Sequence, residues 1–122
     1  MIKGIGIDII EIARIRQSVE KLGDQFLQRI FTPLEINYCK KKHNTYQHLA
    51  ARFAAKEAVS KALSTGWHGD FRWKDVEVMN DKSGQPHITL YGKLHEKLAK
   101  VAIFVSISHS ESHVVAMVVM EG

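Results

Sequence analysis

Two acidic residues and one lysine are the residues best suited to chemistry in this sequence. Asp8 lies within KGIGIDII, which alternates like a β-strand although Asp is disfavoured in strands. Glu57 and Lys61 are four residues apart in RFAAKEAVSKAL, so they share one face of a predicted helix. Two carboxylates suit a cation such as Mg²⁺, and a lysine one turn away suits the oxygens of a diphosphate. We therefore predict a metal site at Asp8 and Glu57, with Lys61 as a phosphate contact.

Each of these residues also has an ordinary structural explanation. Asp8 could cap the helix that follows the strand, and the strand alone leaves both interpretations equally open. Glu57 and Lys61 could form an exposed ion pair, which contributes only about 0.2–0.5 kcal/mol. The combination of Glu57 with Asp8 is what favours the catalytic interpretation.

The residues around Asp8 predict which face of the strand meets the core. Residues two apart share a face, so we expect an apolar face that points into the core, formed by Ile5, Ile7 and Ile9. Gly4 and Gly6 then lie on the same face as Asp8. Their missing side chains predict open space beside the carboxylate, where a ligand could lie on the strand backbone.

The whole chain predicts one α+β domain over residues 1–122, with mixed helices and a mostly antiparallel sheet. Helical spacing predicts an amphipathic helix that ends near Gly23, a capped helix that starts at TPLE, and a longer helix over residues 47–63. VEVM and HITL flank the turn-rich NDKSGQP and predict a hairpin. A short helix over residues 93–100 and two apolar strands, VAIFVSIS and HVVAMVVM, complete the chain.

The composition is ordinary for a soluble globular protein, with 45% hydrophobic and 25% charged residues. No run of about 18 apolar residues exists, so we expect no membrane span, and the N-terminus lacks the pattern of a secretory signal. The single Cys39 suggests a reducing compartment, and we expect a cytoplasmic protein. The formal net charge of +4 favours an anionic partner.

Three stretches together resemble a known family. GIGIDIIEI, then RFAAKEAVSKAL, then SISHS near the C-terminus resemble the bacterial holo-[acyl carrier protein] synthases, the small stand-alone type of 4′-phosphopantetheinyl transferase. The similarity covers nearly the whole chain, and the paired signature is specific although either half alone would be weak. Two departures concern loop geometry rather than chemistry. Residues 64–66 read Ser-Thr-Gly where many relatives have Gly-Thr-Gly, and residues 108–110 read Ser-His-Ser where Ser-His-Thr is commoner.

This resemblance implies a 4′-phosphopantetheinyl transferase-like fold and a specific reaction. The phosphopantetheine arm of coenzyme A moves to a serine of apo acyl carrier protein, adenosine 3′,5′-bisphosphate leaves, and the product serves fatty acid biosynthesis. The resemblance implies that Mg²⁺ is held by Asp8, Glu57 and the diphosphate of coenzyme A, and that Lys61 contacts this diphosphate. The base that deprotonates the serine stays open between Glu57 and a water or hydroxide on the metal.

The resemblance also assigns the residues that bind the rest of coenzyme A. His109 matches a residue near the adenosine end, and Arg52 is a candidate contact for the 3′-phosphate. Ser108 and Gly66 are expected to help bind the same substrate. Small members of the family form homotrimers with active sites between subunits, so we expect a homotrimer.

The first helix is where the resemblance places the acidic carrier protein. We expect its apolar residues to face inward, namely Ile12, Ile15, Val19 and Leu22. Arg14 and Lys21 then lie on the outer side and are expected to bind the carrier. The pattern alone is typical of an ordinary solvated helix face, and the resemblance is what favours docking.

Two other functions remain open for this sequence. A small basic nucleic-acid-binding domain would fit the net charge, but Asp8 and Glu57 argue against it. A non-catalytic coenzyme A or nucleotide-binding module would not need Lys61 beside a metal pair. Trp67, Phe71 and Trp73 could resemble a base-stacking platform, but packing of their loop is the expected role.

Overall fold

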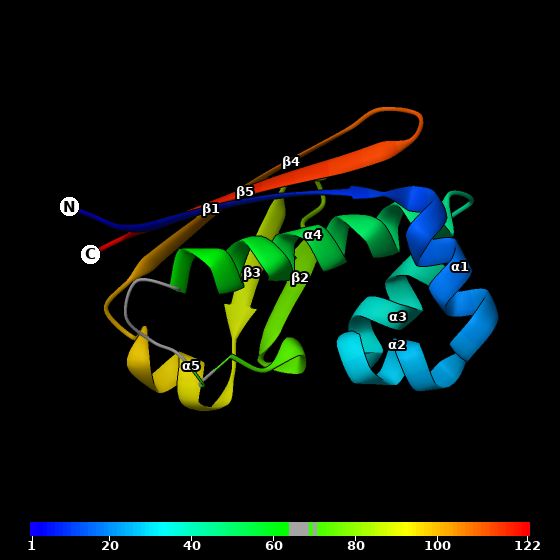
Figure 1. The fold of residues 1–122 in the computed structure, drawn as a ribbon. Helices are drawn as coiled ribbons and strands as arrows, with labels where there is room; N and C mark the ends of the chain where they lie inside the picture. Colours follow the sequence, from blue (N-terminus) through cyan, green and yellow to red (C-terminus); the bar gives the residue numbers. More distant parts are fainter. Residues whose placement is uncertain (64–68, 70) are drawn as a thin grey trace.

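The computed structural model describes residues 1–63, 69 and 71–122, and it confirms the α+β class (Figure 1). Its elements are β1 (Ile2–Glu11), α1 (Ile12–Leu22), α2 (Asp24–Ile30), α3 (Pro33–Lys40), α4 (Thr45–Leu63), the 3₁₀ helix η1 (Trp73–Asp75), β2 (Val76–Asn80), β3 (Pro86–Leu90), α5 (Gly92–Lys97), β4 (Ala102–His109) and β5 (His113–Glu121). Among these described elements, no helix combines the length and apolar character that crossing a bilayer requires.

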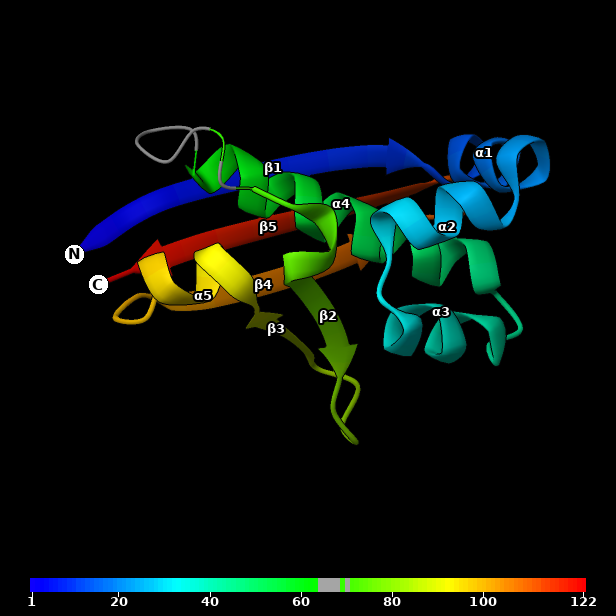
Figure 2. The same cartoon turned by 90° about the horizontal axis from the view of Figure 1, so that it is seen from below.

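The strands form two antiparallel sheets. β1, β5 and β4 lie side by side with β5 in the centre, and this register places Asp8 opposite Ala116. Ile2 pairs with Glu121, so the two ends of the chain lie together (Figure 1). β2 and β3 form the predicted hairpin, which projects away from the three-stranded sheet (Figure 2).

Helix α4 is the central element of the fold. It packs against β1 and β5 on one side and against α1, α3 and β2 on others. A helix covered on several sides has no wide polar face, and more than half of its residues are buried, many of them alanines. Arg52 and Lys56 are buried among them, although charged side chains are rarely buried without a partner.

The predicted orientation of β1 is wrong. Ile5, Ile7 and Ile9 are 62%, 56% and 65% exposed, whereas Gly4 and Gly6 face α4. A Cβ atom on Gly6 would overlap the carbonyl oxygen of Ala58, and one on Gly4 would overlap that of Ala62. The glycines therefore allow a close approach of helix and strand. Helix α4 fills the space beside Gly4 and Gly6 in which a ligand was expected.

Helix α1 also differs from its prediction at one end. Ile15 is buried and Val19 packs against the core, but Leu22 is 47% exposed rather than inward-facing. The chain turns at Gly23, whose φ of 58° is in the left-handed region, and enters α2, a helix that the sequence analysis did not predict. Residues of α2 therefore reach the core in place of Leu22, as shown by the buried Leu27.

Other boundaries agree with the prediction to within a few residues. Thr32 and Glu35 form the predicted capping box: the Thr32 hydroxyl accepts from the Glu35 backbone N–H, and the Glu35 carboxylate accepts from that of Thr32. Helix α3 ends at Lys40, within the basic run of residues 40–42. The two apolar C-terminal strands pair directly with each other, as expected from the short polar turn between them.

Candidate active site

Asp8, Glu57 and Lys61 line one cleft of about 390 Å³ between β1, α1 and α4. The structure thus brings together the three residues that the sequence predicts to be catalytic. The lining also includes Arg14 from α1, and it is completed by the side chains of Ile9, Ile10, Ile15, Ser18, Phe26 and Phe53. Polar groups that converge in a cleft with apolar walls are typical of a binding site.

Lys61 bridges the helix and the strand at this cleft. Its Nζ lies 3.0 Å from Asp8 Oδ1 and donates a second hydrogen bond to the Ile7 carbonyl oxygen, also at 3.0 Å. The Asp8 side chain is 16% exposed and that of Lys61 is 53% exposed, so the lysine side chain is partly accessible from the cleft. Asp8 does not cap α1, since Glu11 is its N-cap residue and no side chain caps it.

Burial and the neighbouring carboxylate of Asp8 both affect the pKa of Glu57. Burial raises the pKa of Glu57, repulsion from Asp8 raises it further, and Lys61 opposes both effects. Two carboxylates that disfavour each other's charge fit a divalent cation, because the cation relieves the repulsion. Within the described part of the chain, no three acidic, histidine or cysteine side chains cluster as metal ligands. Two carboxylates alone still match Mg²⁺, which usually takes one or two and leaves its other positions to water and phosphate.

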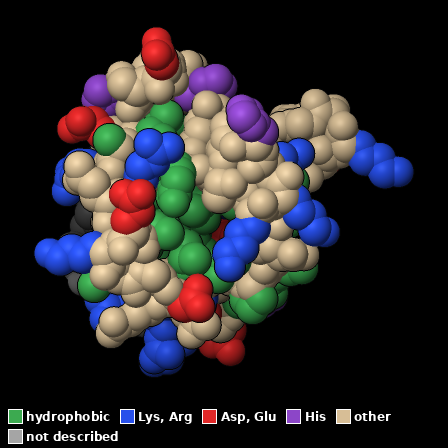
Figure 3. All heavy atoms as spheres, turned by 90° about the vertical axis from the view of Figure 1, so that its right-hand side faces the viewer, with side chains coloured by type: hydrophobic (Ala, Val, Ile, Leu, Met, Phe, Trp, Pro, Cys, Tyr) green, Lys and Arg blue, Asp and Glu red, His purple; other side chains and the backbone are tan. Residues whose placement is uncertain are grey.

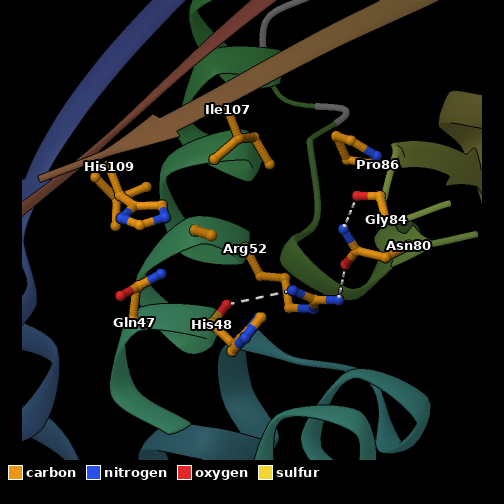
Figure 4. A pocket seen from close by; sticks show the side chains of 10 residues that line it. Gln47, His48, Arg52, Asn80, Gly84, Pro86, Ile107 and His109 are labelled. Atoms are coloured by element: carbon orange, nitrogen blue, oxygen red, sulfur yellow. Dashed lines mark hydrogen bonds between the residues drawn. The ribbon is translucent and has the colours of Figure 1, made fainter. Parts of the chain in front are cut away.

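Arg52 lines a second pocket, of about 220 Å³, on another side of α4 (Figure 4). Its guanidinium is 1% exposed; Nη2 donates to Asn80 Oδ1 at 2.8 Å, and Nη1 to the His48 carbonyl oxygen at 3.4 Å. The Tyr38 ring lies 4.5 Å from the guanidinium carbon. Among the residues that the structure describes, Nε has no hydrogen-bond partner, so this buried cation keeps an unsatisfied donor there.

The charge in this pocket is positive. No acidic side chain is among the described residues that line it, whereas His109 and His48 lie near Arg52 (Figure 4). Burial lowers the pKa of His48, and the positive charges of Arg52 and Lys42 lower it further. A buried guanidinium with a free donor and no carboxylate partner is suited to bind an anion.

The remaining predicted site residues lie elsewhere. Ser108 directly precedes His109 on β4, and both border a hollow of about 250 Å³ together with Ile9 and His113. Gly66 lies outside the described residues. The Asp8 cleft and the Arg52 pocket share no lining residue, so one chain holds the two predicted halves of a coenzyme A site apart.

The predicted docking residues lie near the cleft on α1. Arg14 lines the cleft itself, and Lys21 is exposed in the last turn of the helix. The end of the molecule that carries α1, α2 and α3 presents a strip of apolar side chains bordered by both basic and acidic ones (Figure 3).

Sequence reasoning missed several residues of the two pockets. Asn80 and Tyr38 hold Arg52 from elements distant in sequence, so no local pattern could have indicated them. Phe53 was visible at helical spacing from Glu57, but its stacking on Trp73, with centroids 5.2 Å apart, depends on the tertiary fold.

Comparisons with known proteins show the family to which this chain belongs. The family model of the 4′-phosphopantetheinyl transferase superfamily matches residues 4–118, and the chain belongs to this family. A holo-[acyl-carrier-protein] synthase of Koribacter versatilis is 46% identical over 99% of both chains. The crystal structure of the Neisseria meningitidis synthase aligns with a TM-score of 0.90 and 35% identity, covering all of both chains. The Bacillus anthracis synthase in complex with CoA (3′,5′-ADP) aligns with a TM-score of 0.78 and 43% identity, covering 98% of this chain and 96% of that one. The family resemblance seen in the sequence is therefore confirmed.

Proposed function

We propose that this protein transfers the 4′-phosphopantetheine arm of coenzyme A to a serine of apo acyl carrier protein. The products are holo carrier protein and adenosine 3′,5′-bisphosphate. The observation that carries the proposal is the convergence of Asp8, Glu57 and Lys61 in one cleft of a chain whose relatives are holo-[acyl-carrier-protein] synthases. Neither a nucleic-acid-binding domain nor a non-catalytic binding module is favoured by these relatives.

Asp8 and Glu57 would hold Mg²⁺ in this cleft, and the bound ion would withdraw charge from the diphosphate of coenzyme A. Lys61 is oriented by Asp8 and Ile7, so it can contact a diphosphate oxygen without rearrangement. The formal charges of the two carboxylates are matched by those of Lys61 and Arg14, so the cleft itself has no excess positive charge to offset a diphosphate. A bound cation would supply that charge, and this supports the metal assignment.

The transfer itself forms one bond and breaks one. The serine oxygen of the carrier attacks the phosphorus that bears the pantetheine arm, and the bond from that phosphorus to the bridging oxygen breaks. The developing charge on the leaving phosphate lies where Lys61 can stabilise it. Glu57 is a candidate to accept the serine proton, because burial and Asp8 raise its pKa above that of an ordinary glutamate.

The Arg52 pocket is the proposed site for the 3′-phosphate and adenosine of coenzyme A. The unpaired Nε of Arg52 and the nearby His109 supply donors, and the lining described here carries no opposing charge. This pocket and the Asp8 cleft share no residue, so a neighbouring subunit is the proposed source of the Arg52 half of each site.

The outer face of the three-stranded sheet supports assembly into a homotrimer. Its exposed apolar residues form rows across the three strands, because Ile5 and Phe104 both pair with Val119, and Ile7 pairs with Met117. A contiguous apolar sheet face of this kind is typical of an interface. Ile9 borders both the Asp8 cleft and the hollow beside His109, so a copy docked on this face would lie at the cleft. Light scattering should give the mass of three chains, and a stable monomer would contradict the shared site.

The transfer is tested by mass spectrometry of the carrier. Incubation of apo carrier protein with coenzyme A, Mg²⁺ and this protein should add one phosphopantetheine to the carrier serine and leave the enzyme mass unchanged. Chelation of the metal should stop the reaction. A carrier of unchanged mass with the folded, metal-supplied protein would contradict the proposed function.

A further inference from the structure

Lys56, the residue directly before Glu57, lies at the centre of a buried polar network that the proposed chemistry does not use. Its side chain has no exposed surface, and its ammonium group lies 2.7 Å from Glu35 Oε1. It also donates to the carbonyl oxygens of Trp73, at 2.8 Å, and Val76, at 2.6 Å. Three acceptors match the three N–H bonds of an ammonium group, so the charged form is fully satisfied.

Glu35 extends this network through the fold. Its Oε1 also accepts from the Thr32 backbone N–H at 2.9 Å, and its Oε2 accepts from that of Val78 at 2.8 Å. The Thr32 hydroxyl donates to Glu77 Oε2 at 2.6 Å, and the Tyr91 hydroxyl donates to Glu77 Oε1 at 2.8 Å. One connected set of hydrogen bonds therefore joins α4 to α3, to β2 and to the residue before α5.

Stability alone is a weak explanation for this arrangement. Burial lowers the pKa of Lys56, and attraction to Glu35 opposes the shift. Removing two charges from water is costly, and apolar side chains of similar volume often replace a buried ion pair without loss of stability. An apolar pair could not donate the hydrogen bonds that Lys56 makes to the backbone carbonyl oxygens of Trp73 and Val76.

Two structural connections link the hydrogen bonds of Lys56 to the cleft lined by Glu57. The Trp73 ring stacks on Phe53, with an angle of 24° between the rings, and Phe53 lines the cleft with Glu57. Lys56 and Glu57 are also adjacent on α4 and point to different sides of it. Anchoring Lys56 inside the fold therefore fixes the rotation of α4 that directs Glu57 into the cleft.

We propose that Lys56 is a positioning residue for phosphopantetheine transfer, holding Glu57 and the Phe53–Trp73 wall in place from the inner side of α4. The proposal rests on the transferase function proposed above. A purely structural role would lower stability alone. The proposal instead requires kcat to fall in a variant that remains folded.

The test removes the ion pair without leaving a lone buried charge. In the double variant Lys56→Met and Glu35→Gln, we expect a cooperative fold, a kcat about tenfold to a hundredfold lower, and a KM for coenzyme A changed by less than about threefold. Val59→Ala is the matched control, because Val59 is buried on the same helix but outside the network. It should lower thermal stability and leave kcat unchanged.

A spectroscopic readout separates this idea from the transferase proposal. With Trp67→Phe as background, Trp73 is the single tryptophan of the chain. Its emission should shift to longer wavelength and be quenched more by acrylamide in the double variant, but not in Val59→Ala. These changes need no turnover, so they remain measurable if transfer fails in the unmutated protein.

Trp73→Ala keeps the test decisive if the double variant does not fold. It leaves Lys56 paired with Glu35 and removes only the ring that supports Phe53. We expect kcat to fall about tenfold while the protein stays folded. An unchanged kcat in this variant, or in a folded double variant with unaltered Trp73 emission, would overturn the proposal.

Discussion

The ammonium of Lys61 lies 3.0 Å from Asp8 Oδ1, and this ion pair joins α4 to β1 at the mouth of the cleft. The same Nζ donates to the Ile7 carbonyl oxygen, so both bonds orient the lysine before any ligand binds. A charge held in place in advance stabilises a transition state without the cost of reorganisation. The close approach of strand and helix at Gly4 and Gly6 is what makes this geometry possible.

Replacing Lys61 with Ala should reduce kcat/KM for transfer by roughly 10²–10³-fold, as for loss of other preorganised electrostatic donors. The physical reason is the lost stabilisation of charge on the leaving phosphate. Initial rates of holo carrier formation measure the effect. Lys93→Ala, an exposed lysine on α5, is the matched control and should behave like the unmutated protein. Equal rates for the two variants would indicate that Lys61 serves only as a structural ion pair with Asp8.

The raised pKa of Glu57 predicts how metal use depends on pH. As pH falls from about neutral, Glu57 becomes protonated earlier than an ordinary glutamate, and a protonated carboxyl no longer binds Mg²⁺. The Mg²⁺ concentration for half-maximal rate should therefore rise as pH falls and level off above the raised pKa. Glu57→Gln should abolish this dependence in direct metal-binding measurements. The assignment would be contradicted by a half-saturation constant that begins to rise at no higher pH than an ordinary glutamate predicts.

Arg52 should recognise the 3′-phosphate of coenzyme A. In Arg52→Met, the KM for coenzyme A should rise about tenfold or more, because a charged hydrogen bond to the phosphate is lost. Dephospho-coenzyme A lacks this phosphate and should show nearly the same KM with both proteins. Arg52→Lys keeps the charge and should recover part of the loss. If Arg52→Met raises the KM for coenzyme A and for dephospho-coenzyme A equally, the pocket binds another part of the molecule.

Arg14 should steer the acidic carrier protein towards the cleft that it lines. Arg14→Glu should lower kcat/KM for the carrier several-fold and change the KM for coenzyme A less, although Arg14 lines the same cleft. The loss should shrink as salt rises, because exposed charges are screened beyond about 8–10 Å. Lys21→Glu, at the exposed end of α1, should show a weaker effect of the same kind. A loss that is independent of salt, or that affects both substrates equally, would exclude electrostatic docking.

The candidate catalytic residues Asp8, Glu57 and Lys61 could be found from the sequence because their residue types suit metal and phosphate chemistry. Helical spacing places Glu57 and Lys61 on one face, and the unusual position of Asp8 in a strand draws attention to it. The predicted pairing within the helix was incomplete, since Lys61 pairs with Asp8 on β1 in the structure. Long-range geometry of this kind depends on how α4 lies on the sheet, which local spacing does not determine.

The orientation of β1 shows where the sequence pattern misleads. Alternation identifies two faces of a strand but not which one meets the core. Ile5, Ile7 and Ile9 form the more hydrophobic face, yet the face with Gly4 and Gly6 is buried because α4 packs directly on the backbone. The isoleucines are therefore left exposed on the outer face of the sheet. The sequence does contain an indication of this close packing, because small residues occur both on this strand and along α4.

The role of Asp8 and Glu57 as a shared cation site is tested most directly by metal binding itself. Titration with Mn²⁺, followed by the loss of the free-ion electron paramagnetic resonance signal in the presence of coenzyme A, reports affinity without turnover. We expect the unmutated protein to bind the ion, and both Asp8→Asn and Glu57→Gln to bind it at least about tenfold more weakly, since each loses one of two carboxylate ligands. Affinities equal to that of the unmutated protein in both folded variants would contradict the account.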